Sequence, residues 1–380
     1  MKVAVTTLAF CVAALLALGL VMLYSSSMNY WGAHYLKLQL IWCTLGLICC
    51  VAATALDYRL LKPAAWPVYL FTLAMLVLVL LHLPHGITGK INGAHRWLRI
   101  GSIMIQPSEL GKIALIVLLA RYCDRYQRHM HTFKRGVLIP GMFIAPLLGL
   151  VFIEPDRGGT ILLGAVCGIM LLMAGVRWRH FFIPAAAGGA VMAVAIVRDP
   201  LRMNRIMAWI HPQQHLQDAA GQAQQAMIAL GAGGWTGLGL GNGRQKLGFL
   251  PLNQTDFIFP VVGEELGLIA TLLILAAFVI IALCGLCIAV NSRDTFGSLL
   301  AVGFTSLITL QAAINIGVAT GALPNKGLPL PFISYGGSNL LVMLASVGVL
   351  LSIARRAPVR AKNSRAVTES DENPFAARAV

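Results

Sequence analysis

The chain divides into about ten apolar runs, each close to the length that crosses a bilayer, and this limits its fold more than any other feature. The runs lie near residues 3–24, 38–56, 66–83, 108–122, 136–153, 159–175, 181–198, 262–290, 296–320 and 339–354. Hydrophobic residues make up 58% of the 380 residues, which excludes an ordinary soluble domain. Runs this long satisfy their backbone polar groups in lipid only as helices. The sequence therefore predicts an all-α integral membrane protein with about ten transmembrane helices.

The lysine and arginine residues predict how these helices are oriented. More than half of the 29 cations fall in segments that are cytoplasmic if the N-terminus is inside, and such residues favour the cytoplasmic side. The first apolar run follows only Lys2 and lacks a cleavage site, so we expect a retained helix with both termini in the cytoplasm. A multi-span protein explains the net charge of +15 better than nucleic-acid binding, which we do not expect.

Three segments outside the membrane are long enough to carry a site. The largest is one outer loop, residues 199–261, between predicted helices 7 and 8. Residues 84–107 alternate between apolar and polar types, which favours a half-buried strand or an interfacial segment, and residues 321–338 are rich in proline and glycine. We assign residues 1–354 to one membrane domain and residues 355–380 to a polar cytoplasmic tail that we expect to be disordered.

One carboxylate, Asp256, stands apart at the end of the large outer loop. The segment 250–266 reads LPLNQTDFIFPVVGEEL, and no basic residue lies within six positions of this aspartate. The apolar neighbours Phe257 and Phe259 are expected to raise its pKa and make it a better general base. Aspartate is also a common cap of a following helix. The residues alone leave these two interpretations equally open.

Two other charged groups have a structural and a functional interpretation. Glu109 and Lys112 lie three residues apart at the start of a span, with Ser108 as a candidate cap, and we favour a structural ion pair over contact with a polar head group. Residues 154–158 read EPDRG, for which we favour a structural turn. Arg157 in this turn has the geometry to bind an anionic ligand.

Four stretches carry a resemblance to a known family. They read GAHRWLRIGSIMIQPSELGK, EPDRGG, GLGLGNGRQKLGFLPLNQTDFIFPVVGEELG and PNKGLPLPFISYGGS. In this order, from about residue 90 to 340, they resemble the motifs of the SEDS family (shape, elongation, division and sporulation). The last stretch is closer to the division members, with the elongation members as the near alternative. The chain departs from the family at Gly221, Ala226 and Leu252, where Tyr, Ser and Glu are usual.

The resemblance implies an activity. Members of the family are ten-span peptidoglycan glycosyltransferases that polymerise lipid II on the outer face of the bacterial cytoplasmic membrane. Each works with a class B penicillin-binding protein, which is a transpeptidase, so we expect lipid II, that partner, other division proteins and membrane lipid to bind. The resemblance selects Asp256 as the catalytic base. A lipid II flippase and a non-catalytic division scaffold are the competing interpretations.

The remaining site residues follow from the chemistry of lipid II. Its pyrophosphate needs cations, and the residues that we expect to contact the substrate are Arg96, Glu109, Lys112, Arg202, Arg205, Gln222, Gln225, Lys246, Lys326 and Ser334. Glu264 and Glu265 are expected to orient these cations or to hold a divalent ion, rather than to act as further bases. Apart from such a divalent cation, we expect no cofactor and no dedicated metal site.

Overall fold

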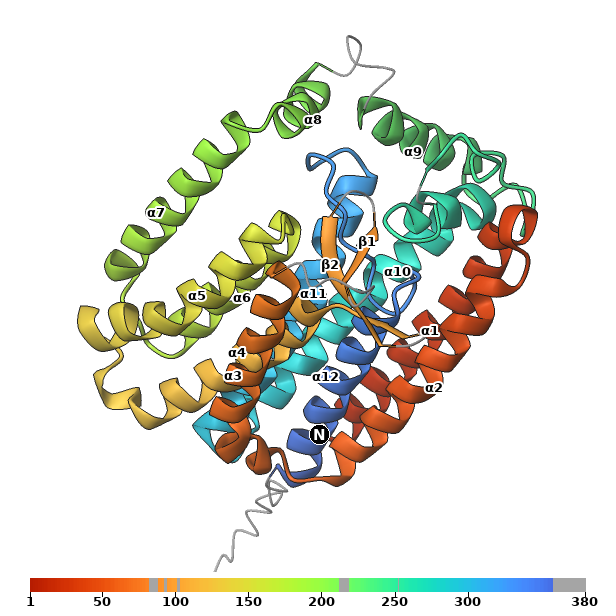
Figure 1. Cartoon of the computed structure of the whole chain (residues 1–380). Helices are drawn as coiled ribbons and strands as arrows, with labels where there is room; N and C mark the ends of the chain where they lie inside the picture. The colour runs from red at the N-terminus through yellow and green to blue at the C-terminus, as the bar shows by residue number, and fades with distance from the viewer. Residues whose placement is uncertain (82–87, 92–93, 101–102, 212–218, 252, 358–380) are drawn as a thin grey trace, which may run out of the picture.

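The computed structural model describes residues 1–81, 88–91, 94–100, 103–211, 219–251 and 253–357. Each predicted span corresponds to a helix in this part of the chain (Figure 1). These helices are α1 (Lys2–Trp31), α2 (His34–Ala55), α3 (Leu61–Leu80), α4 (Pro107–Arg125), α5 (Ile139–Ile153), α6 (Arg157–Met173), α7 (Trp178–Val197), α10 (Ile258–Val290), α11 (Thr295–Ala319) and α12 (Gly337–Arg356). The predicted tail lies outside the described residues from position 358 onward.

Not all of these helices meet the requirements for crossing a membrane by themselves. Among the described residues, eight helices are long and apolar enough, and α6 is a shorter apolar helix. The remaining one, α4, carries charged residues at both ends, including Glu109 and Arg125. The protein is therefore a multi-pass, helical membrane protein, as the sequence predicted, while the number of spans stays a prediction.

The helices differ strongly in how far other helices enclose them. In α12, 83% of the most apolar window is buried, and in α11 the figure is 67%, so these two helices lie at the centre of the bundle. By contrast, none of the described residues of α7 is buried. Figure 1 shows α7 at the outer edge of the molecule, connected to the bundle mainly through its ends. A helix exposed on all sides and apolar throughout fits a lipid environment.

A small antiparallel sheet follows α3, which the all-α prediction did not include. It consists of β1 (Thr88–Ile91), β2 (Ala94–Ile100) and β3 (Ile103–Ile105) in that order. Leu98 pairs with Ile105 and is buried, so one face of β2 packs inward as the alternating pattern predicted. The sheet confirms the strand alternative for the described part of the segment 84–107.

The large outer segment contains two helices that we expected to be loop. They are α8 (Pro200–Ile210) and α9 (Ala219–Gly233). Neither segment is a long apolar run, so hydropathy alone does not reveal these helices, although alanine and glutamine in α9 are good helix formers. Residues of β2, α8 and α9 line the same cavity. These elements surround the candidate site.

Two expected helix caps are not present. The N-cap of α4 is Gln106, and its side chain makes no capping hydrogen bond. The Ser108 hydroxyl oxygen instead accepts a hydrogen bond from the side-chain amide of Gln106 at 2.8 Å. The N-cap of α10 is Phe257, again without a side-chain cap. Asp256 therefore does not cap the following helix. This removes the structural interpretation that the sequence had left open for it.

Candidate functional site

A cavity of about 530 Å³ lies where the sheet, α8, α9 and two proline-containing segments meet. Asp256 faces it, together with cations and amides from distant parts of the sequence. The polar residues that line it are Arg96, Asp156, Arg157, Arg202, Arg205, Gln222, Asp256, Asn325 and Lys326. The fold thus brings the predicted base together with four of the predicted cations and one of the predicted glutamines.

The backbone around Asp256 is held by side chains from two other elements. The Asn315 side-chain amide, near the C-terminal end of α11, donates hydrogen bonds to the carbonyl oxygens of Asp256 at 2.9 Å and of Leu328 at 2.7 Å. The Ser334 hydroxyl donates to the Thr255 carbonyl oxygen at 2.5 Å. The segments that precede α10 and α12 are therefore tied to each other. This fixes the position from which the carboxylate enters the cavity.

The Asp256 carboxylate is half-buried, and within the described residues it accepts no hydrogen bond. Burial is the main cause that raises the pKa of Asp256 to about 6. The positive charge of Arg205 opposes this rise, the negative charge of Asp156 adds to it, and Arg96 opposes it more weakly. A carboxylate with a raised pKa that is still ionised at neutral pH is suited to act as a general base. The predicted rise in pKa is thus found.

A glycine makes room for this carboxylate. A Cβ atom placed on Gly327 would lie 2.8 Å from Asp256 Oδ2. That is closer than real Cβ contacts come, so any larger residue at this position would displace the carboxylate or the loop. The PNKG motif is consequently part of the geometry around the predicted base.

The cations of the cavity are held in different ways. The Arg96 guanidinium donates from Nε to the Glu154 carbonyl oxygen and from Nη2 to the Pro155 carbonyl oxygen, both at 2.8 Å. Arg202 pairs with Asp199 at 2.9 Å on α8. Lys326 is half-buried, and burial lowers the pKa of its ammonium group. Among the described residues no carboxylate pairs with Lys326, so its charge is available to an anion in the cavity.

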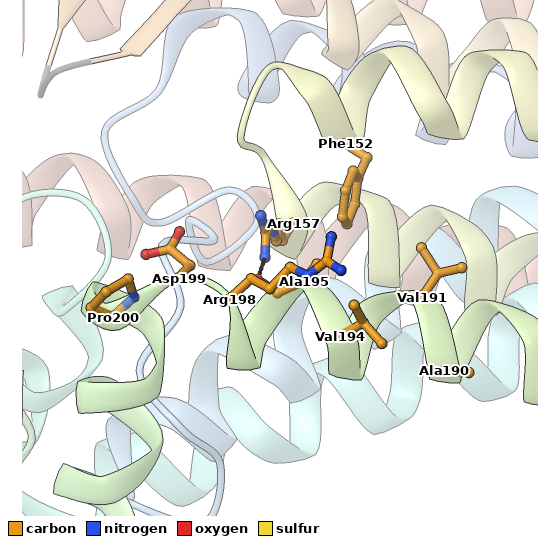
Figure 2. Close-up of a pocket in the computed structure, with 9 residues that line it drawn as sticks. All are labelled: Phe152, Arg157, Ala190, Val191, Val194, Ala195, Arg198, Asp199 and Pro200. Carbon is orange, nitrogen blue, oxygen red and sulfur yellow. Dashed lines mark hydrogen bonds between the residues drawn. The ribbon is translucent and has the colours of Figure 1, made fainter.

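An apolar groove of about 700 Å³ adjoins this cavity, between α5, α6 and α7 (Figure 2). Its wall includes Phe152 of α5 and Val191 and Val194 of α7. Arg157 lines both the groove and the cavity. Its guanidinium donates to the Ala195 carbonyl oxygen at 2.8 Å and lies 4.7 Å from the centre of the Phe152 ring. The detached position of α7 leaves this groove open toward the lipid.

The turn before α6 has the structure that the sequence favoured. The Asp156 carboxylate accepts a hydrogen bond from the Gly159 amide at 2.9 Å and caps α6. The turn still contributes Asp156 and Arg157 to the cavity wall. The structural and functional interpretations of this segment are therefore compatible.

Several predicted contact residues lie outside the cavity. Lys112 forms a buried ion pair with Glu109 at 2.7 Å and donates to the Gln311 side chain at 3.1 Å, as expected for the structural alternative. Gln225 and Ser334 are not part of the cavity lining either. Contact of these residues with a substrate stays a prediction. Their positions show how the bundle is held together around the site.

Lys246 is also outside the cavity, because it pairs with one of the two predicted supporting glutamates. Its ammonium group lies 2.6 Å from Glu265, and both side chains are almost fully buried. Glu265 also accepts a hydrogen bond from the Ser25 hydroxyl of α1 at 2.7 Å. Glu264 accepts hydrogen bonds from the backbone amides of Arg244 at 2.7 Å and Gln245 at 3.2 Å. The acidic pair thus attaches the glycine-rich segment to the start of α10.

No metal site is visible in the described ranges. There, no three His, Cys, Asp or Glu side chains are grouped so that they could hold an ion. Glu265 pairs with Lys246, which lies outside the cavity, so the expected role of the two glutamates in orienting the substrate-binding cations stays a prediction. A divalent cation stays a prediction.

Some residues of the site were not predicted from the sequence. Asn315 and Asn325 were not selected, although the Asn325 amide donates to Gln222 at 2.8 Å in the cavity wall. The signal for Asn315 was available, since a polar residue inside an apolar span is usually functional. The signal for Asn325 was its place in the PNKG part of a stretch that carries the family resemblance.

The fold and the cavity define a class: a multi-pass membrane protein that places the Asp256 carboxylate in a cavity lined by several cations. Residues 6–358 match the sequence model of the FtsW, RodA and SpoVE family, described as cell cycle protein. The chain belongs to this family, as its motifs indicated. The match covers the whole described bundle apart from its first residues.

Relatives of known name resemble this chain over most of its length. A Trichlorobacter lovleyi protein named probable peptidoglycan glycosyltransferase FtsW is 40% identical over 363 residues, which is 93% of this chain and 94% of that protein. Stage V sporulation protein E of Bacillus subtilis is 37% identical and spans 90% of this chain and 94% of that protein. These similarities extend across the elements that form the cavity.

Solved structures support the fold. A chain of a peptidoglycan synthase complex, studied for its coordination of polymerization and crosslinking, aligns with a TM-score of 0.78 at 28% identity, covering 92% of this chain and 96% of that one. The rod shape determining protein RodA of Thermus thermophilus aligns with a TM-score of 0.68 at 27% identity, covering 92% and 95%. The helical arrangement is thus that of known family members.

Proposed function

We propose that this chain is an inverting peptidoglycan glycosyltransferase that polymerises lipid II on the outer face of the bacterial cytoplasmic membrane. The observation that carries the proposal is the Asp256 carboxylate, which faces a cavity lined with cations and has a pKa raised to about 6 by burial. Its relatives named peptidoglycan glycosyltransferase support the same activity.

In the proposed reaction Asp256 removes the proton from the 4-hydroxyl group of the acceptor's GlcNAc. The oxygen attacks the anomeric carbon of the donor's MurNAc, and the bond from that carbon to the pyrophosphate oxygen breaks. The configuration changes from α to β, and undecaprenyl pyrophosphate leaves with the bonding electrons. Pyrophosphate needs no proton to leave, so the second carboxylic acid found in inverting glycosidases is not required.

The cations of the cavity neutralise charge that develops on the leaving group. Arg96, Arg205 and Lys326 enter the cavity from three different elements, so they can surround a pyrophosphate rather than contact one side of it. Groups that stabilise charge in the transition state typically contribute about 2–4 kcal/mol each. Arg96 is held in place by two backbone carbonyl oxygens, so little reorganisation is needed when the charge develops.

The groove beside the cavity accommodates the polyprenyl tail of the substrate. It is lined by Phe152, Val191 and Val194, and Arg157 connects it to the cavity. A tail that lies along α7 places the attached pyrophosphate next to the cations. This arrangement requires the cavity to be on the outer side of the membrane, with both termini in the cytoplasm, as the distribution of lysine and arginine predicts.

We assign the protein to septal synthesis in cell division, together with other division proteins and a class B penicillin-binding protein as the transpeptidase partner. Relatives named FtsW are 35–40% identical to this chain, whereas the RodA structure is 27% identical. The similarity to a chain of a peptidoglycan synthase complex supports a partner that crosslinks the product.

The test is an assay that scores three outcomes at once. Purified protein in proteoliposomes receives fluorescent lipid II, with and without the transpeptidase partner and with and without EDTA. We expect glycan polymer, which EDTA abolishes only if a divalent cation takes part. Translocation of lipid II without polymer would identify a flippase, and neither product in the presence of the partner would identify a scaffold.

A further inference from the structure

A second pocket lies at the opposite end of the bundle from Asp256, between α3, α4 and α5. Its volume is about 560 Å³, within the roughly 300–1,000 Å³ of pockets that hold small molecules. Its wall combines aromatic and aliphatic side chains, and two arginines line it as well. The residues that matter here are Trp66, Tyr122, Tyr126, Phe143, Arg121 and Arg125. Neither the family's chemistry nor the cavity described above uses this pocket.

The pocket lies beside the start of α3, and Figure 1 marks the N-terminus at this end of the bundle. Arg121 donates to the carbonyl oxygens of Lys62 at 2.6 Å and Pro63 at 3.3 Å, in the first turn of α3. In the segment that joins α2 to α3, Asp57 pairs with Arg356 at the end of α12 at 3.3 Å. The proposed orientation places this face in the cytoplasm.

The arginines of this pocket carry charge that no acidic side chain compensates. Arg125 is exposed, and its guanidinium lies 5.9 Å from the centre of the Tyr126 ring. Arg135 lies over the same ring at 5.5 Å. The neighbouring carboxylate of Asp124 is occupied by Lys62 at 2.5 Å. Across the residues that the structure describes, no carboxylate pairs with these arginines or with Arg121, so a net positive charge remains at the pocket.

The rest of the pocket is apolar and exposed to the membrane. Met142 is 72% exposed and Trp66 is 45% exposed, while Phe143 behind them is buried. The rings of Trp66 and Phe143 lie 6.3 Å apart, and Phe143 lies 5.5 Å from the ring of Tyr122. Tryptophan and tyrosine beside arginine are typical of the level at which a helix leaves the hydrocarbon for the head groups.

We propose that this pocket binds an anionic phospholipid of the leaflet that faces the chain ends. Its phosphate lies between Arg121 and Arg125, and an acyl chain packs against Trp66, Met142 and Phe143. Basic pockets between transmembrane helices on the cytoplasmic side are suited to anionic lipid head groups. A zwitterionic lipid carries its own cation beside the phosphate and therefore gains less from two uncompensated arginines. The binding does not depend on the proposed catalytic reaction.

Native mass spectrometry of the full-length protein tests this site. The purified protein is titrated with phosphatidylglycerol or phosphatidylethanolamine, and the fraction that retains one lipid is measured. Each arginine is worth about a fivefold preference for the anionic lipid. We expect R125Q to lower the preference about fivefold and R121Q/R125Q to lower it about 25-fold. The matched control is R177Q/R179Q, which removes two exposed arginines at the start of α7 on the same face.

The two variants separate binding from folding. Arg121 donates to two carbonyl oxygens and contributes to structure, whereas Arg125 makes no hydrogen bond within the described part of the chain. R125Q should therefore melt at the temperature of the unchanged protein and still lose its preference. Equal retention of the two lipids by the unchanged protein would overturn the proposal. The proposal is also overturned if R125Q keeps the full preference for the anionic lipid. It is overturned as well if R177Q/R179Q loses as much of that preference as R121Q/R125Q.

Discussion

The buried ion pair between Lys246 and Glu265 leads to a prediction that separates a structural role from contact with the substrate. The two side chains are 3% and 0% exposed, with 2.6 Å between the charged atoms. Lys246→Met leaves the Glu265 carboxylate buried without its cation. Removing one partner of a buried pair typically costs about 3–5 kcal/mol. The Ser25 hydroxyl at 2.7 Å and the Gly241 backbone amide at 3.1 Å also donate to Glu265. Because both donors are neutral, they replace only part of the stabilisation that the Lys246 ammonium group gives the carboxylate.

The assay compares Lys246→Met with the double variant Lys246→Met, Glu265→Gln. Thermal unfolding in detergent should show a large loss of stability in the single variant. Most of it should return in the double variant, because the uncompensated charge is gone. Polymerisation of lipid II by the double variant should return as well. If Lys246→Met is as stable as the unchanged protein, the reasoning from burial is refuted. If the double variant is stable but inactive, Lys246 contacts the substrate as the sequence predicted.

Three further predictions concern the cavity. Gly327→Ala places a Cβ atom 2.8 Å from Asp256 Oδ2 and should slow polymerisation about 10- to 100-fold. Its control is Gly149→Ala, where the new Cβ atom meets nothing within 4 Å and the rate should not change. Equal rates for the two variants would contradict the geometry around Asp256. The pKa of Asp256 is about 6 and the base must be ionised, so kcat/KM should be constant above about pH 7 and fall about tenfold per unit below pH 6. A profile flat to pH 5 would exclude this base. Lys326→Met should cost about 2–4 kcal/mol of transition-state stabilisation, measured as a lower single-turnover rate. The control is Lys37→Met, which removes an exposed cation outside the cavity and should leave that rate unchanged.

The sequence predicted the membrane-spanning elements well because each is encoded locally. The length of an apolar run is enough to predict a membrane-spanning helix. The alternation of apolar and polar residues in β2 is enough to predict a strand with one buried face. The helices α8 and α9 were missed for the same reason, since neither is a long apolar run. Their helical structure follows from propensity and from packing around the cavity.

The candidate site was predictable in part. Asp256 could be found because it is isolated among apolar residues and because its motif resembles a known family. Which cations accompany it could not be found, because this depends on contacts between distant segments. Lys246 is close to Asp256 in sequence but pairs with Glu265, while Arg96 is far away in sequence and reaches the cavity.

The measurement that tests the central claim most directly is polymerisation of lipid II by Asp256→Asn. Asparagine has nearly the same shape but cannot accept the proton, and no hydrogen bond to the carboxylate is lost within the described residues. Asp124→Asn, at the opposite face, controls for the loss of one negative charge. We expect Asp256→Asn to melt normally and to form no glycan polymer, while Asp124→Asn remains active. Polymerisation by correctly folded Asp256→Asn at the rate of the unchanged protein would contradict the assignment of Asp256 as the base.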